Sequence, residues 1–193
     1  MELRKRLALP LAAVFAVGLP AGAMAQDGGT LVAAIGAEPD QLDPHVTSSY
    51  NSFQVLENVV DTLVEPDENL EMVPALAESW EVSEDGLTYT FDLRDGVTWH
   101  DGSAFTANDV VYSYGRWATN NGWRFAEGTE VSAQDDDTVV FTLPAPAPNF
   151  LSNIGAYKGL AIVQEANVES GDITTMPIGT GPFKVAAWNS GDS

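Results

Sequence analysis

The hydrophobic pattern changes its period between residues 80 and 118, and this change limits the fold more than any other feature of the sequence. Apolar and polar residues alternate from Thr88 to Arg94, as in a strand with one buried face. Glu84-Asp85-Gly86 is a turn signal, so Trp80–Ser83 is predicted to pair with Thr88–Arg94 as a hairpin.

Helical spacing replaces the alternation after the turn signal Asp101-Gly102. Thr106 and Asp109 have the spacing of a capping box, in which Thr106 accepts from the amide of Asp109 and the carboxylate of Asp109 reaches back. This predicts a helix that begins at Ala107. Its apolar face is expected to contain Ala107, Val110, Val111, Tyr114, Trp117 and Ala118.

A second hairpin is predicted downstream, from Val131–Gln134 through a turn at 135–137 to the alternating residues that end at Leu143. Val97–Trp99 is predicted to form a further short strand. The proline-rich stretch 144–150 cannot continue a central strand, because proline lacks the amide donor. This meander with interspersed helices predicts an α+β fold.

The first part of the mature chain is predicted to contain one strand and one helix. Leu31–Ile35 has the apolar run of a buried strand. Residues 52–65 are predicted to form an amphipathic helix. Its apolar residues are Val55, Leu56, Val59, Val60 and Leu63.

Residues 1–25 have the pattern of a secretory signal peptide. Three basic residues precede the apolar run Leu7–Leu19, and small residues follow up to Ala25, after which we expect cleavage and a periplasmic location. The alternative, a membrane anchor, is disfavoured because a spanning helix needs about 20 apolar residues.

The charge excludes one class of partner. The chain carries a net charge of −20, and without residues 1–25, which hold one acidic and three basic residues, 27 acidic and 5 basic residues leave −22. Nucleic-acid binding needs clustered basic residues, so it is excluded. The acidity indicates either a cationic ligand or a solvated surface, and we favour the solvated surface. The absence of cysteine excludes a lipid anchor on a mature N-terminal cysteine.

No pattern predicts a catalytic residue, a metal site or a cofactor. His45 and His100 are the only histidines, and neither has a second ligand at helical spacing. We interpret His100 as a partly buried hydrogen-bonding residue at a strand end. The aspartates at 135–137 lack the glycine of a calcium loop, and the glycines of Gly179–Lys184 do not complete a phosphate loop. The sequence therefore does not predict an enzyme.

Three blocks in order resemble one family. They are LAESWEVSEDGLTYTFDLRDGVTWHDGSAFTANDVVYSY at 76–114, DDDTVVFTL at 135–143 and PIGTGPFKV at 177–185. The chain is similar to the extracellular solute-binding proteins of family 5, the peptide, dipeptide and nickel receptors of ABC importers. The resemblance implies a mixed α/β fold like periplasmic binding proteins of type II, with an incomplete first lobe, a small inserted β-rich domain and no second lobe.

The resemblance also implies a division of the chain. Residues 26–49 would start the first lobe, residues 50–166 would form the inserted domain, and residues 167–193 would return into a truncated first lobe. Such receptors are more than twice as long, so we expect an N-terminal fragment. One lobe alone is expected to bind short peptides no better than about millimolar, because it makes only part of the contacts.

The resemblance finally implies a ligand and a partner. We expect a short peptide as ligand, the membrane permease of an ABC transporter as partner, and a monomer. The ligand residues are expected near the cleft, at Thr47, Ser48, Ser49, Tyr50, Gly179, Thr180 and Gly181. The alternatives are a nickel- or haem-uptake receptor of the same fold, or a secreted acidic domain without catalysis.

Overall fold

The computed structural model describes residues 29–121, 127–156 and 158–191. The predicted signal peptide, residues 1–25, lies outside these residues. The chain divides into two compact units, Met1–Ala34 and Ile35–Ser193. In the first unit, the described residues 29–34 form neither helix nor strand and are exposed. All elements below belong to the second unit.

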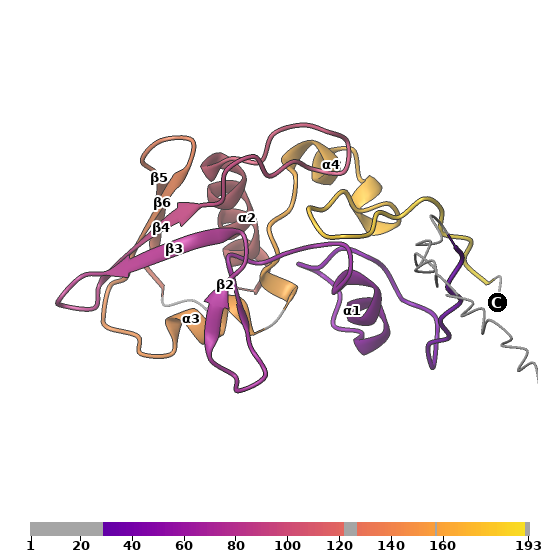
Figure 1. The fold of residues 1–193 in the computed structure, drawn as a ribbon, viewed down its shortest axis with the longest axis horizontal. Coiled ribbons are helices and arrows are strands. Elements are labelled where there is room, and N and C mark those ends of the chain that lie inside the picture. The colour runs from indigo at the N-terminus through magenta and orange to yellow at the C-terminus, as the bar shows by residue number, and fades with distance from the viewer. Residues whose placement is uncertain (1–28, 122–126, 157, 192–193) are drawn as a thin grey trace, which may run out of the picture. The chain divides into compact units, whose positions relative to one another are not determined.

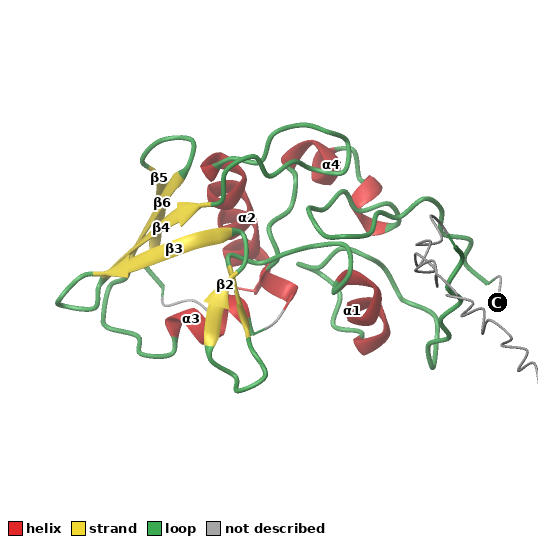
Figure 2. Ribbon diagram, viewed as in Figure 1, coloured by secondary structure: helices red, strands yellow, loops and turns green. Residues whose placement is uncertain are grey.

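The second unit contains a four-stranded antiparallel sheet with the order β3-β4-β6-β5 (Figures 1 and 2). The strands are β3 (Ala77–Val82), β4 (Thr88–Leu93), β5 (Glu130–Ala133) and β6 (Thr138–Thr142). Both predicted hairpins are therefore confirmed. The predicted strand 97–99 is reduced to one isolated bridge between Thr98 and Ala104.

The turn between β3 and β4 forms as the Glu84-Asp85-Gly86 signal predicts. Gly86 has a φ of 69°, a left-handed conformation that glycine adopts without steric cost. The Asp85 carboxylate accepts hydrogen bonds from the Ser83 hydroxyl at 2.6 Å and the Leu87 amide at 3.0 Å. These bonds replace the cross-strand hydrogen bonds that are missing at the turn, where the chain reverses direction.

Helix α2 (Ala107–Asn121) lies against the sheet and contacts β5 and β6 (Figure 1). Its contact face is the predicted one, except that Val111 is half-buried and Ala118 is exposed. The ring of Tyr114 meets Phe141 of β6 edge-on, with centroids 4.8 Å apart. Exposure of a methyl group as small as that of Ala118 costs little.

The capping box is confirmed in one half only. The Asp109 carboxylate accepts from the Thr106 amide at 2.8 Å, as predicted. The Asp109 amide, however, donates to the main-chain carbonyl of Thr106 at 3.0 Å, and the Thr106 hydroxyl lies 3.3 Å from the same carboxylate. Burial raises the pKa of Asp109 despite these bonds. Asp109 therefore does most of the capping.

The predicted helix at 52–65 is wrong in its extent. Helix α1 spans Tyr50–Leu56, and the chain then turns into β1 (Val64–Pro66), which pairs with β2 (Met72–Pro74). The carbonyl of Asn58 accepts from the Phe183 amide, and that of Val59 from the Gly181 amide, each at 3.0 Å. A continuous helix would need the carbonyls of Asn58 and Val59 for its own backbone hydrogen bonds. Because amides from distant residues occupy these carbonyls, the helix does not continue through them.

The predicted strand Leu31–Ile35 is also wrong. The described residues there form no strand, and Leu31 is 91% exposed. Residues 183–188 likewise form no strand, and Phe183 is 64% exposed. A strand needs a neighbour for its backbone groups, and no described strand pairs with either segment.

The buried apolar residues form two clusters. The larger lies between the sheet, α2 and α3 (Phe150–Gly155). The smaller joins α1 to the segments on either side of it and to the distant Ala161. Its members are Leu42, Phe53, Leu56, Val59, Val60 and Ala161. The short elements η2 (Lys158–Leu160), α4 (Glu165–Glu169) and η3 (Asp172–Thr174) complete the described chain. Within it, no helix combines the length and hydrophobicity that crossing a membrane requires.

Candidate functional site

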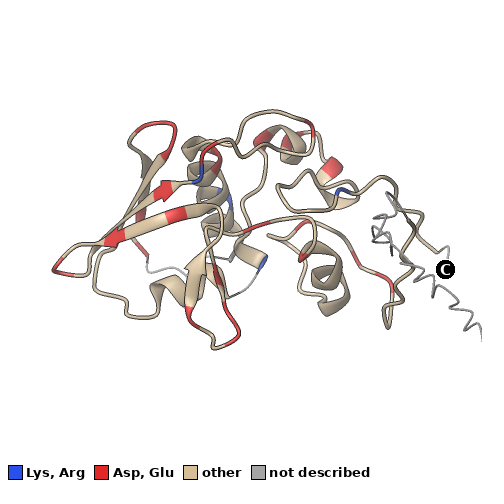
Figure 3. Ribbon diagram, viewed as in Figure 1, with Lys and Arg blue, Asp and Glu red and all other residues tan. Residues whose placement is uncertain are grey.

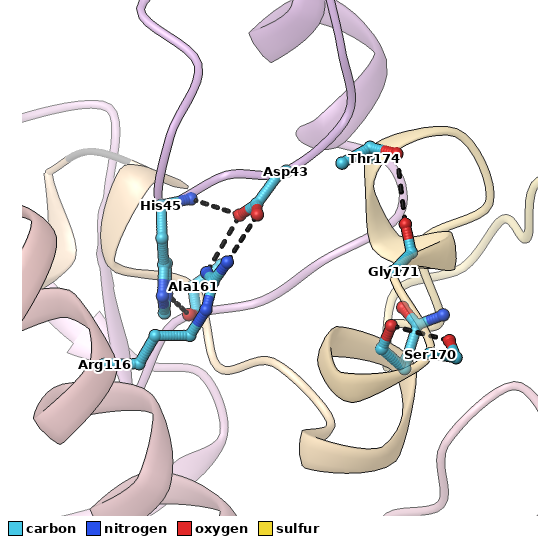
Figure 4. Close-up of polar contacts among 8 residues, drawn as sticks. Asp43, His45, Arg116, Ala161, Ser170, Gly171 and Thr174 are labelled. Carbon is cyan, nitrogen blue, oxygen red and sulfur yellow. Dashed lines mark hydrogen bonds and ion pairs between the residues drawn. The ribbon is translucent and has the colours of Figure 1, made fainter.

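Asp43 anchors the segment 43–50, which contains four of the predicted ligand residues (Figure 4). Its carboxylate accepts from both terminal nitrogens of Arg116 on α2, at 3.0 and 2.5 Å, and from the His45 amide at 3.0 Å. The Asp43 side chain is 3% exposed and that of Arg116 17%. Two-point guanidinium–carboxylate pairing is directional, so it orients this segment on the helix.

His45 lies beside this ion pair and is completely buried. Its Nε2 is 2.8 Å from the carbonyl oxygen of Ala161 (Figure 4). A carbonyl only accepts, so Nε2 carries the hydrogen in this bond. Burial lowers the pKa of His45 to about 4, so the ring is neutral near pH 7. The residue is a structural link between two distant segments.

Thr47 is buried, and its hydrogen bonds are internal. Its hydroxyl donates to the Asp40 carboxylate at 2.6 Å and accepts from the Ser49 amide at 3.1 Å. Ser52 of α1 donates to the same carboxylate oxygen at 2.7 Å. The bond from Thr47, and then that from Ser52, lowers the pKa of Asp40. Thr47 and Ser49 thus shape the approach to α1.

Ser48 and Tyr50 line an open groove of about 560 Å³. Tyr50 is 75% exposed, and Ser48 is exposed as well. Apolar atoms of the groove come from Phe53, Pro66, Gly155 and Ala156, and charged groups from Glu57, Glu65 and Lys158. The groove therefore combines an aromatic wall, an apolar surface and charges of both signs, which suits a small polar organic ligand.

Lys158 connects the groove to the second group of predicted residues. Its ammonium lies 3.5 Å from the Asp61 carboxylate and 4.0 Å from that of Glu65. Asp61 also accepts from the Thr180 hydroxyl at 2.8 Å. Thr180 is thus one hydrogen bond and one ion pair away from a residue that lines the groove.

Gly179 and Gly181 pack directly on the backbone of residues 58 and 59. A Cβ atom on Gly179 would stand 1.8 Å from the Val59 carbonyl oxygen, and one on Gly181 2.8 Å from that of Asn58. Only glycine permits this approach. The two glycines therefore hold the loop in place by close contact.

His100 clamps the same loop and is half-buried. The Gly179 amide donates to its Nδ1 at 3.2 Å, and its Nε2 lies 2.8 Å from the Gly181 carbonyl oxygen. Because Nδ1 accepts, the hydrogen is on Nε2. The interpretation of His100 as a hydrogen-bonding residue is confirmed. Across the described ranges, no three His, Asp or Glu side chains form a group that could hold a metal ion.

A sequence profile for "Bacterial extracellular solute-binding proteins, family 5 Middle" matches residues 71–193, which is most of the chain. The chain belongs to this family.

Relatives of the family-5 chain include the glutathione-binding protein GsiB of Pectobacterium atrosepticum. It is 35% identical over 170 residues, which are 83% of this chain and 32% of GsiB. The family-5 chain thus spans about a third of the length of this relative.

Solved structures of the family share its fold. DppA of Helicobacter pylori, in complex with the peptide STSA, is 33% identical, with a TM-score of 0.68 over 80% of this chain and 36% of DppA. NikZ of Campylobacter jejuni, in complex with Ni(L-His), is 31% identical, with a TM-score of 0.67 over 81% of this chain and 32% of NikZ. The expected type II binding-protein fold with a partial lobe is confirmed.

Sequence reasoning about this family-5 chain missed the charged side of the groove. The helix predicted at 52–65 contains Glu57 and Glu65 but does not indicate that they lie near Lys158. One signal was present, since Lys158 is one of only five basic residues after residue 25. In so acidic a chain a partly buried lysine is expected to pair with a carboxylate, and Asp61 and Glu65 supply that partner.

Proposed function

We propose that this chain is the N-terminal part of a periplasmic receptor that binds short peptides and delivers them to the permease of an ABC importer. One observation carries the proposal: the chain aligns over 80% of its length, at 33% identity, with the periplasmic binding protein DppA of Helicobacter pylori, which was solved in complex with the peptide STSA. The similarity to GsiB, a glutathione-binding protein, supports the same ligand class.

The proposed mechanism is binding without chemistry. Two lobes close around the peptide, and the closed form docks on the permease. The peptide shifts this equilibrium only through contacts that differ between the open and closed forms. In the proposal, residues 26–49 and 167–193 belong to the first lobe, residues 50–166 form the inserted domain, and the receptor acts as a monomer.

We assign different parts to the seven predicted site residues. Ser48 and Tyr50 would contact the ligand, because both line the groove. Thr180 would act through Asp61 and Lys158. Thr47, Ser49, Gly179 and Gly181 would support the groove, because their hydrogen bonds and close contacts lie within the protein.

A nickel complex is the competing ligand, because NikZ was solved with Ni(L-His). Two observations weigh against it here. The described residues hold no group of metal-binding side chains, and both histidines are engaged by main-chain groups. Neutral imidazoles that already serve the backbone are poor candidates for recognising a metal–histidine complex.

Ligands released from the natural protein test the proposal. The receptor expressed from its complete reading frame, with its leader, would be purified from the periplasm and weighed by native mass spectrometry. We expect a chain that starts at Gln26 and carries peptides of two to five residues, identified after acid release. Release of nickel or haem instead of peptides would contradict the ligand class, and a chain that retains residue 1 would contradict secretion.

A further inference from the structure

The groove has more negative than positive charge. Glu57, Glu65 and Lys158 line it, and Asp61 stands behind Lys158. The Lys158 side chain is 16% exposed, and its ammonium is already shared between Asp61 and Glu65. Two carboxylate charges are therefore left uncompensated. Figure 3 shows the wider setting, in which acidic residues far outnumber basic ones.

Glu57 is the freest of these carboxylates. It is exposed at the end of α1, and within the described part of the chain its carboxylate has no ion pair or hydrogen bond. Glu65 is 48% exposed and 4.0 Å from Lys158, farther than a hydrogen bond. Both carboxylates can therefore accept from an incoming donor without breaking a close bond.

The rest of the groove lining suits the aliphatic part of a ligand side chain. Tyr50, at 75% exposure, leaves most of its ring open, and Phe53, Pro66 and Ala156 add apolar atoms. Aromatic faces attract cations as well as apolar groups. A lysine or arginine side chain has this combination, an aliphatic stem that ends in a cation.

We infer that this groove binds a cationic side chain of the ligand, so that the receptor prefers peptides that contain lysine or arginine. The inference rests on the proposed function and narrows its substrate class. An anionic side chain fits less well, because Lys158 is already neutralised and the remaining lining charges would repel it. The net charge of −22 that remains without residues 1–25 also favours the approach of a cationic peptide.

Calorimetric titrations with three matched tripeptides test the inference. The complete receptor would be titrated with Ala-Lys-Ala, Ala-norleucine-Ala and Ala-Glu-Ala, which differ in charge at one side chain. We expect affinities in that order, with about a tenfold difference between the lysine and glutamate peptides. Glu57→Gln and Glu65→Gln should each reduce the affinity for the lysine peptide by about threefold and leave that for the norleucine peptide unchanged.

Glu68→Gln is the matched control, because Glu68 is an exposed acid between β1 and β2 that does not line the groove. It removes the same net charge, so an equal effect on the lysine peptide would contradict the inference. Glu57→Gln alone decides the outcome if Glu65→Gln proves unstable. Equal affinities for all three peptides would overturn the inference but leave the proposed function standing. No binding of any peptide would overturn the proposed function itself.

Discussion

The Nε2 atom of His45 lies 2.8 Å from the carbonyl oxygen of Ala161, 116 residues further along the chain. Beside it, Asp43 is paired with Arg116 of α2. These contacts tie the segment before α1 to the segment that follows η2. They explain how a groove can be built from residues near 50 and near 158 at once.

Acidification should destabilise the protein through His45. Burial lowers its pKa in the folded state to about 4, from the ordinary value of 6.5. The unfolded chain therefore takes up a proton first as the pH falls below about 6.5, and stability is lost progressively down to about pH 4. The shift corresponds to roughly 3 kcal/mol. Urea denaturation at several pH values measures it.

His45→Gln is the control for this pH effect, because glutamine can donate to the Ala161 carbonyl but does not titrate. We expect its free energy of unfolding to depend less on pH between 6.5 and 4.5. Parallel curves for the two proteins over that range would show that His45 does not carry the effect.

Asp109 should contribute more to the start of α2 than Thr106 does. Asp109→Ala removes the carboxylate that caps the Thr106 amide, and we expect a loss of about 1 kcal/mol in the free energy of unfolding. Thr106→Ala keeps that main-chain bond and should cost less than half as much. The denaturation midpoints of the two variants, compared at an unchanged m-value, measure these losses in the free energy of unfolding. A larger loss for Thr106→Ala would restore the full capping box that the sequence predicts.

Gly179→Ala should prevent correct packing of the loop at 179–181. The new methyl group would stand 1.8 Å from the Val59 carbonyl oxygen, so backbone must move, and we expect a loss of at least about 3 kcal/mol. Gly115→Ala is the matched control, with nothing within 4 Å of its Cβ position. It should be neutral or stabilise α2 by up to about 1 kcal/mol. Equal melting temperatures for the two variants would refute the packing argument.

His100→Asn should lower stability without changing ligand affinity. The shorter side chain loses the ring contacts to Gly179 and Gly181, each worth about 1 kcal/mol. Peptide affinity of the folded receptor should change by less than about twofold, because the ring hydrogen-bonds to the loop and does not line the groove. Combined urea denaturation and calorimetry test this. A large loss of affinity with an unchanged denaturation midpoint would make His100 a ligand residue.

Local patterns predicted the parts of the fold whose partners are close in sequence. The two hairpins and α2 follow from period and turn signals, because each strand pairs with its neighbour across a short turn. The helix at 52–65 failed because the carbonyls of Asn58 and Val59 are taken by amides more than 120 residues away. Local helix propensity does not reflect this competition from distant amides.

The candidate site was only partly predictable for the same reason. Ser48 and Tyr50 were expected near the ligand and do line a groove. Thr47 has the same polar character, but its side chain is buried and donates to the Asp40 carboxylate, so it does not face the groove. The charged groups depend on Lys158, which α3 and η2 carry to Glu65 from far along the chain. The scarcity of basic residues indicates that Lys158 has an acidic partner, but a single sequence does not show which carboxylate it is.

The central claim is that the complete receptor binds short peptides reversibly. Calorimetric titration of the protein from the complete reading frame, with a library of dipeptides to pentapeptides, tests it most directly. We predict one binding site, micromolar or tighter affinity for at least one peptide, and recovery of every peptide uncleaved. Absence of binding across the library, or recovery of cleaved peptides, would contradict it.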